Sequence, residues 1–130
     1  MFTRDEHCPP HVHVGNREWD ARFLFSFWHN GVSLWDVTPT QNTPCARVLE
    51  ELRQVLKRRA NLRRARECWW ISRSTLCLEN QGWDEDAHEV AAVHIDRPAT
   101  CPILCAAFDP QANITRLRLS GRLCPLEIQL

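Results

Sequence analysis

The residues with the clearest potential for chemistry are three histidines near the N-terminus, in the segment His-Cys-Pro-Pro-His-Val-His-Val that begins at His7. His11 and His13 are two residues apart, so on a β-strand both imidazoles project from the same face. The rigid Pro9-Pro10 pair is expected to fold His7 back toward them. The sequence therefore predicts a cluster of three imidazoles.

Three kinds of role fit such a cluster. Neutral imidazoles bind zinc or another divalent transition metal, and His7, His11 and His13 are the candidate ligands. The same three histidines are candidate catalytic residues, acting as acid and base on a phosphodiester or similar substrate with Arg22 as an anion contact. In the third role the histidines hydrogen-bond to the backbone and fix an edge strand. The residues alone leave all three open.

The cysteines offer a second possible metal site. Cys101 and Cys105 could join His94 and Cys124 as four zinc ligands, although the spacing is not that of a zinc knuckle. Cys105 lies within an apolar strand pattern, which favours buried and inert thiols. A catalytic cysteine beside the histidines is a further alternative, but the sequence singles none out.

A basic segment is the main argument for nucleic-acid contact. From Arg47 to Glu67 there are eight Arg or Lys residues against three Glu, while the formal net charge of the whole chain is zero. Cations that follow one helix can contact successive phosphates. The acidic run from Asp84 to Asp86 is an alternative partner for them within the fold. The candidate binding residues are Arg53, Lys57, Arg58, Arg63 and Arg64.

Composition predicts a globular protein of the cytoplasm. The chain has 130 residues, of which 44% are hydrophobic, and its six Trp and five Phe can fill a core. Seven Cys without an apolar leader over Met1 to Asp5 predict free thiols in a reducing compartment. No apolar run approaches the roughly 20 residues that span a bilayer. The Walker, dinucleotide-binding and Gly-x-Ser-x-Gly motifs are missing, which disfavours nucleotide-dependent enzymes.

Hydrophobic periodicity predicts an α+β fold. Residues 19–28 alternate with one strongly aromatic face, and Asn30-Gly31 is a favoured hairpin turn. Thr43 and Pro44 suit the start of an amphipathic helix over 44–68. The other expected strands are 11–14, 32–37, 71–78, 90–95, 103–108, 114–119 and 123–130. We predict an antiparallel sheet with one long helix packed on it and C-terminal strands extending that sheet, so that segments 1–70 and 71–130 pack as one unit.

Residues 1–70 resemble the small bacterial family known as domain of unknown function 4160. The resemblance rests on the acidic approach Asp5-Glu6-His7, on the element from Pro9 to Val14, on a β-hairpin and on a helix that ends near Trp69. Members of that family are small, are often encoded on mobile elements beside another small gene, and look like toxin–antitoxin components. The resemblance implies that setting but no mechanism.

These features favour a non-enzymatic interaction module of a toxin–antitoxin-like or mobile-element system. It would bind a partner protein, RNA or DNA through the Arg-rich helix and would not contact a membrane. The alternative is a small histidine-dependent hydrolase or ribonuclease, or a metal-binding protein, that uses the three histidines. A homodimer is also possible, because the aromatic strand over 19–28 could form a dimer edge.

Overall fold

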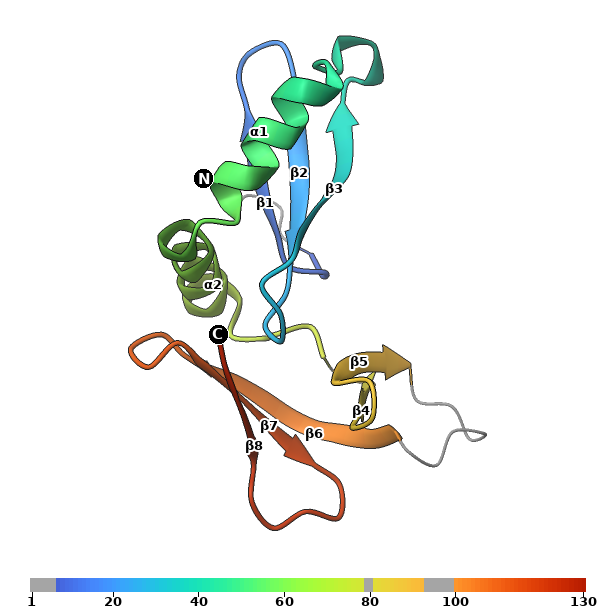
Figure 1. The fold of residues 1–130 in the computed structure, drawn as a ribbon, viewed down its shortest axis with the longest axis vertical. Coiled ribbons are helices and arrows are strands. Elements are labelled where there is room, and N and C mark those ends of the chain that lie inside the picture. Colours follow the sequence, from blue (N-terminus) through green and yellow to red (C-terminus); the bar gives the residue numbers. More distant parts are fainter. Residues whose placement is uncertain (1–6, 79–80, 93–99) are drawn as a thin grey trace.

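The computed structural model describes residues 7–78, 81–92 and 100–130. Three strands come first in the chain, two helices follow, and five further strands end it (Figure 1). The elements are β1 (His11–Gly15), β2 (Asp20–Phe25), β3 (Val32–Thr38), a 3-10 turn (Thr40–Asn42), α1 (Ala46–Leu56), α2 (Arg59–Arg73), β4 (Gln81–Asp84), β5 (Glu89–Ala92), β6 (Thr100–Asp109), β7 (Ile114–Leu119) and β8 (Leu126–Gln129).

The strands form two antiparallel sheets, which confirms the predicted α+β class. One sheet has the order β1-β2-β3 and the other the order β5-β4-β6-β7-β8. The C-terminal strands thus build a sheet of their own. The prediction that they extend the first sheet is wrong. The reason is that α2 buries Leu62, Ala65 and Trp69 in a core to which both sheets contribute, so the second sheet covers α2.

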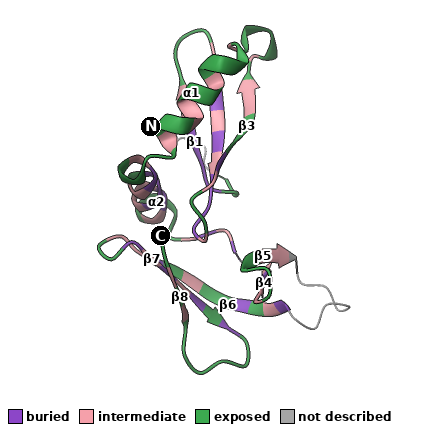
Figure 2. Ribbon diagram, in the orientation of Figure 1, coloured by how far each residue is buried: buried purple, intermediate pink, exposed green. Residues whose placement is uncertain are grey.

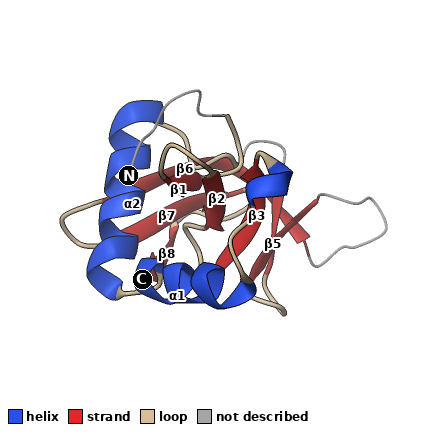
Figure 3. Ribbon diagram, turned by 90° about the horizontal axis from the view of Figure 1, so that it is seen from above, coloured by secondary structure: helices blue, strands red, loops and turns tan. Residues whose placement is uncertain are grey.

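The helix predicted over 44–68 is two helices. Arg58 interrupts it with an extended ψ of 135°, and the Asn61 side chain donates to Val55 O at 2.8 Å, which satisfies one carbonyl at the end of α1. The first helix begins at Ala46 and not at Pro44. Seen from above, α1 and α2 lie along two sides of the strands (Figure 3). The basic residues of the segment therefore lie on two helices and on the junction between them.

Strand β2 supplies the centre of the core, as its alternating pattern predicts. Ala21, Phe23 and Phe25 are buried, while the residues between them are partly exposed (Figure 2). Phe27 follows on the same side, and its ring centroid lies 5.2 Å from that of Phe108 in β6. The aromatic face of this strand is therefore inside the protein, where it joins the two sheets. Because β2 lies between β1 and β3, it is not an edge strand, and the homodimer stays a prediction.

Two other expectations need correction or lie outside the described residues. The strand predicted over 71–78 is wrong, because α2 continues to Arg73 and the chain then leaves it through Ser74 in the left-handed region. The strand predicted over 90–95 is found in part as β5, and its last three positions lie outside the described residues. None of the helices in the described part of the chain has the length and apolarity that crossing a membrane requires.

Candidate functional site

The first sheet brings the predicted histidines and Arg22 together. His11 and His13 lie on β1, and the register places His13 opposite Arg22 on β2. Arg22 in turn lies opposite Asp36 on β3, so the three side chains form a row across the sheet. His7, just before β1, has its ring centroid 5.8 Å from that of His11, and the centroids of His11 and His13 are 5.1 Å apart.

Trp35 completes this cluster, and sequence reasoning missed it. The register between β2 and β3 shifts after Arg22, so Trp35 has no partner directly opposite it on β2. Its indole lies 5.9 Å from the ring of His7 and 5.3 Å from the ring of His11. The Arg22 guanidinium carbon lies 4.0 Å above the indole, in the geometry of a cation–π contact. The first sheet and the residues just before it thus hold an aromatic and cationic cluster, which we call the histidine cluster: His7, His11, His13, Arg22 and Trp35.

Hydrogen bonds in this cluster determine which ring nitrogen of His11 and of His13 carries the proton. His11 Nδ1–H donates to Pro9 O at 2.8 Å and His13 Nδ1–H donates to Asp20 Oδ2 at 2.7 Å. His11 is 1% exposed, and this burial lowers its pKa, so its imidazole is neutral at pH 7. His13 Nε2 is buried and has no hydrogen-bond partner among the residues that the structure describes. Arg22 is held by Asp36, to which it donates from both Nε and Nη2.

This arrangement stabilises the sheet more clearly than it performs chemistry. His11 is enclosed, the Nε2 lone pair of His13 is covered, and the guanidinium of Arg22 is already paired with a carboxylate. His7 and Trp35 are the exposed members of the cluster. Over residues 7–78, 81–92 and 100–130, no group of three His, Cys, Asp or Glu side chains could hold a metal ion.

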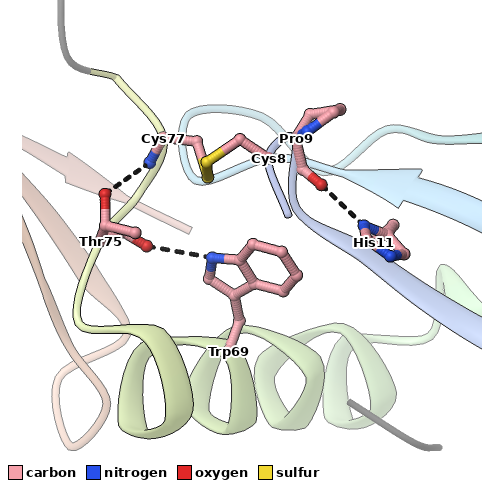
Figure 4. The surroundings of a disulfide bond; sticks show 6 residues. All are labelled: Cys8, Pro9, His11, Trp69, Thr75 and Cys77. Carbon is pink, nitrogen blue, oxygen red and sulfur yellow. Dashed lines mark hydrogen bonds between the residues drawn. A yellow bond between two sulfur atoms is a disulfide. The ribbon is translucent and has the colours of Figure 1, made fainter. Parts of the chain in front are cut away.

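A disulfide that the sequence did not predict anchors the histidine cluster. Cys8 and Cys77 are bonded across 69 positions of sequence, so the expectation that all seven cysteines are free thiols is wrong for these two. Figure 4 shows the bond beside Pro9, with Trp69 of α2 below it. Trp69 Nε1–H donates to Thr75 O at 3.0 Å, and its ring lies 5.5 Å from that of His11.

The disulfide also bears on the predicted location. Disulfides persist mainly in oxidising compartments, so the thiol argument for the cytoplasm no longer applies to the whole chain, and the location stays a prediction.

We expected the cysteines considered as zinc ligands to be buried and inert, but the structure does not bury them. Cys105 and Cys124 are exposed and Cys101 is partly exposed. Their fourth proposed partner, His94, lies outside the described residues.

The comparisons with known proteins leave the family open. No protein-family model, no curated protein and no solved structure matches the chain. The resemblance of residues 1–70 to domain of unknown function 4160 therefore stays a prediction, and function has to be argued from the side chains themselves.

The structure separates the predicted binding cations into two groups. Some of them serve the fold: Arg53 pairs with Glu50 and donates to Val32 O, and Arg63 donates to Pro110 O and Gln111 O. Hydrogen bonds from Arg53 and Gln54 lower the pKa of Glu50 to about 2. These two arginines are thereby occupied, so they are poorly placed to bind a partner.

Arg66 is the most completely enclosed cation of this segment. It is 1% exposed, its Nε donates to Ser26 O at 2.8 Å, and its Nη2 donates to His29 O at 2.7 Å and to Asn30 Oδ1 at 3.0 Å. All three acceptors belong to the turn between β2 and β3. Burial lowers the pKa of Arg66 to about 10, so the guanidinium remains charged at pH 7. The sequence gives no sign of this role, because Arg66 is one of several arginines in a basic stretch.

The second group of cations is exposed at the junction of the two helices. Lys57, Arg58 and Arg59 are consecutive there, and Arg64 is exposed further along α2. We call the first three the basic elbow. Within the described residues, Arg58, Arg59 and Arg64 form no ion pair. The acidic run does not neutralise them either, since Glu85 pairs with Arg122 and the Asp84 carboxylate accepts backbone N–H groups.

Proposed function

We propose that this chain is a nucleic-acid-binding module whose contact surface is the basic elbow together with Arg64. The observation that carries the proposal is the division of the cations: Arg53, Arg63 and Arg66 are used within the fold, and the elbow and Arg64 are left exposed. Exposed Arg and Lys side chains that follow one another along a surface bind successive phosphates and release condensed counterions. Arginine adds bidentate hydrogen bonds to phosphate oxygens.

The setting of this function is part of the same proposal. The resemblance in residues 1–70 implies a toxin–antitoxin-like or mobile-element system, in which a small cytoplasmic module binds RNA, DNA or a partner protein. We favour nucleic acid because the elbow is cationic and has no apolar side chain among its three residues. A protein partner is the alternative outcome, and it would show as binding that is insensitive to salt.

A pair of matched double variants tests the proposal. We expect Arg58→Ala/Arg64→Ala to weaken binding to a fluorescently labelled single-stranded RNA by about tenfold or more at low salt, because two phosphate contacts are lost. The control is Arg17→Ala/Arg118→Ala, which removes the same charge from two exposed arginines elsewhere in the fold. Fluorescence anisotropy measures both, with thermal unfolding as a check of foldedness. Equal weakening by the two double variants would show that only total charge matters and would contradict the proposal.

A second candidate function, a small histidine-dependent ribonuclease, rests on one observation. His13 Nε2 keeps an unpartnered lone pair beside His11, while Asp20 holds the proton on Nδ1. A carboxylate that orients an imidazole in this way suits it to act as a general base. Because Nε2 is covered in this structure, this candidate requires the side chains over it to move before a substrate can reach the nitrogen. If the histidine cluster is catalytic, His13→Asn should lower the rate of RNA cleavage by about a hundredfold or more, because a general base contributes that much. The control His88→Asn changes an exposed histidine in the turn between β4 and β5, and equal rates in both variants would rule the candidate out.

A further inference from the structure

An apolar pocket of about 330 Å³ lies at one end of the first sheet, beside the turn between β2 and β3. Buried residues form its floor, among them Pro10, Phe25 and Val32. Its rim is accessible, because Trp28 is partly exposed and His29 and Ser33 are exposed. No Asp, Glu, Lys or Arg side chain lines it. Its volume is at the lower end of the roughly 300 to 1,000 Å³ of small-molecule sites, so it suits one neutral ring system.

The turn that borders this pocket is held in place by Arg66 of α2. The Nε of Arg66 donates to Ser26 O at 2.8 Å, and its Nη2 donates to His29 O at 2.7 Å. Within the turn, the backbone N–H of His29 donates to Ser26 Oγ at 3.2 Å. Because these bonds fix the turn, the pocket is formed before a ligand arrives, and binding does not have to order its wall.

Two residues at the rim offer hydrogen bonds to an occupant. His29 Nδ1 accepts from the backbone N–H of Gly31 at 2.9 Å, so the ring carries its proton on Nε2, which donates to no group of the described residues. Partial desolvation and the nearby charge of Arg66 lower the pKa of His29, so the imidazole is neutral at pH 7. The Ser33 hydroxyl also has no hydrogen-bond partner in the part of the chain that the structure describes.

The same turn lies between this pocket and the basic elbow. His29 and Gly31 line the apolar pocket. Asn30, the residue between them, borders a second cavity whose wall includes Lys57 and Arg59 of the elbow. A chain that crosses the turn can therefore contact the cations on one side and the apolar pocket on the other.

We propose that this pocket takes up one unpaired base of the nucleic acid whose phosphates contact the basic elbow. The base lies against the indole of Trp28, and its carbonyl oxygens or ring nitrogens accept from His29 Nε2–H and from the Ser33 hydroxyl. Unstacked bases that lie on aromatic side chains and hydrogen-bond through their edges are typical of single-stranded RNA recognition. The inference rests on the proposed function and narrows its ligand to a single strand, since a paired base within a duplex is not free to enter a pocket.

Fluorescence anisotropy with two labelled strands of equal length and charge tests the proposal. One is a single-stranded RNA, and the other is the same ribose-phosphate chain without bases. We expect the parent to bind the strand with bases about fivefold more tightly or better, because stacking of even one base on an aromatic side chain contributes that much. Ser33→Leu fills the pocket and should remove most of this preference. Ser120→Leu makes the same exchange at an exposed serine after β7 that does not line the pocket, and it should keep the preference.

The outcomes separate this inference from the proposed function. Equal binding of the two strands by the parent would overturn the inference and leave the proposed function standing. A preference that persists in a folded Ser33→Leu variant would also overturn it, because the base would then be bound elsewhere. Binding of neither strand would overturn the proposed function and this inference with it. The comparison of the two strands in the parent needs no variant, so it decides the matter even if Ser33→Leu does not fold.

Discussion

Replacing Arg66 by methionine is expected to lower the free energy of unfolding by about 3 to 5 kcal/mol, since it removes the donors of a buried hydrogen-bond network. Methionine has a similar length and keeps most of the packing. It removes the guanidinium donor from Ser26 O and Asn30 Oδ1, and it leaves His29 O with the Ser26 hydroxyl as its remaining donor. The turn between β2 and β3 would then lose its hydrogen bonds to α2, while the ring contact between Phe27 and Phe108 would still join the two sheets.

Urea unfolding followed by tryptophan fluorescence measures this effect. The matched control is Arg64→Met, which makes the same change two positions earlier on the exposed side of α2. Surface substitutions of this kind change stability by about 0.5 kcal/mol or less. An Arg66→Met variant within 1 kcal/mol of the parent, by the scale of such buried networks, would show that water satisfies the three acceptors and that Arg66 is not a structural cation.

The second large effect is expected from the Cys8–Cys77 disulfide. Its removal in a Cys8→Ser/Cys77→Ser variant should lower the free energy of unfolding by about 4 kcal/mol, because the bond closes a long loop of the unfolded chain. The two cysteines are 69 positions apart, and that interval contains β1 to β3 and both helices. The bond also holds the start of β1 against the segment that accepts the Trp69 hydrogen bond.

Unfolding in the presence and absence of a reducing agent provides the measurement. A Cys45→Ser/Cys105→Ser variant is the control, since both residues are exposed free cysteines, and its stability should match that of the parent. If reduction leaves the unfolding midpoint of the parent unchanged, the two thiols are not joined in solution, and the expectation of free cysteines is restored for them.

Local pattern was enough to predict most of the strands. The alternation around Phe23 predicts β2 and its buried face, and the run Ile114 to Leu119 is found as β7 with the predicted bounds. The spacing of His11 and His13 also predicts that they share a face, and the centroids of their rings lie 5.1 Å apart. These features depend on a period of two residues, which a single strand carries in its own sequence.

Features that depend on distant partners could not be predicted in this way. The joining of Cys8 to Cys77 and the burial of Arg66 are decided by how the sheets pack on α2, which no local period records. The position of Trp35 depends on a register shift between two strands. The spacing of the leucines does indicate the break between the two helices. Leu62 follows Leu56 by six residues, which displaces it by about 120° around a continuous helix, whereas Leu49, Leu52 and Leu56 share one face.

The most direct measurement of the central claim is the salt dependence of RNA binding by the unmodified chain. With about four phosphate contacts from the basic elbow and Arg64, the slope of log K against log salt concentration should be roughly −2 to −3 for a single strand. In Arg58→Ala/Arg64→Ala the slope should fall to about half that value, because two of the four contacts are gone. A parent slope near zero, or the same slope in parent and variant, would contradict the assignment of nucleic-acid binding to this surface.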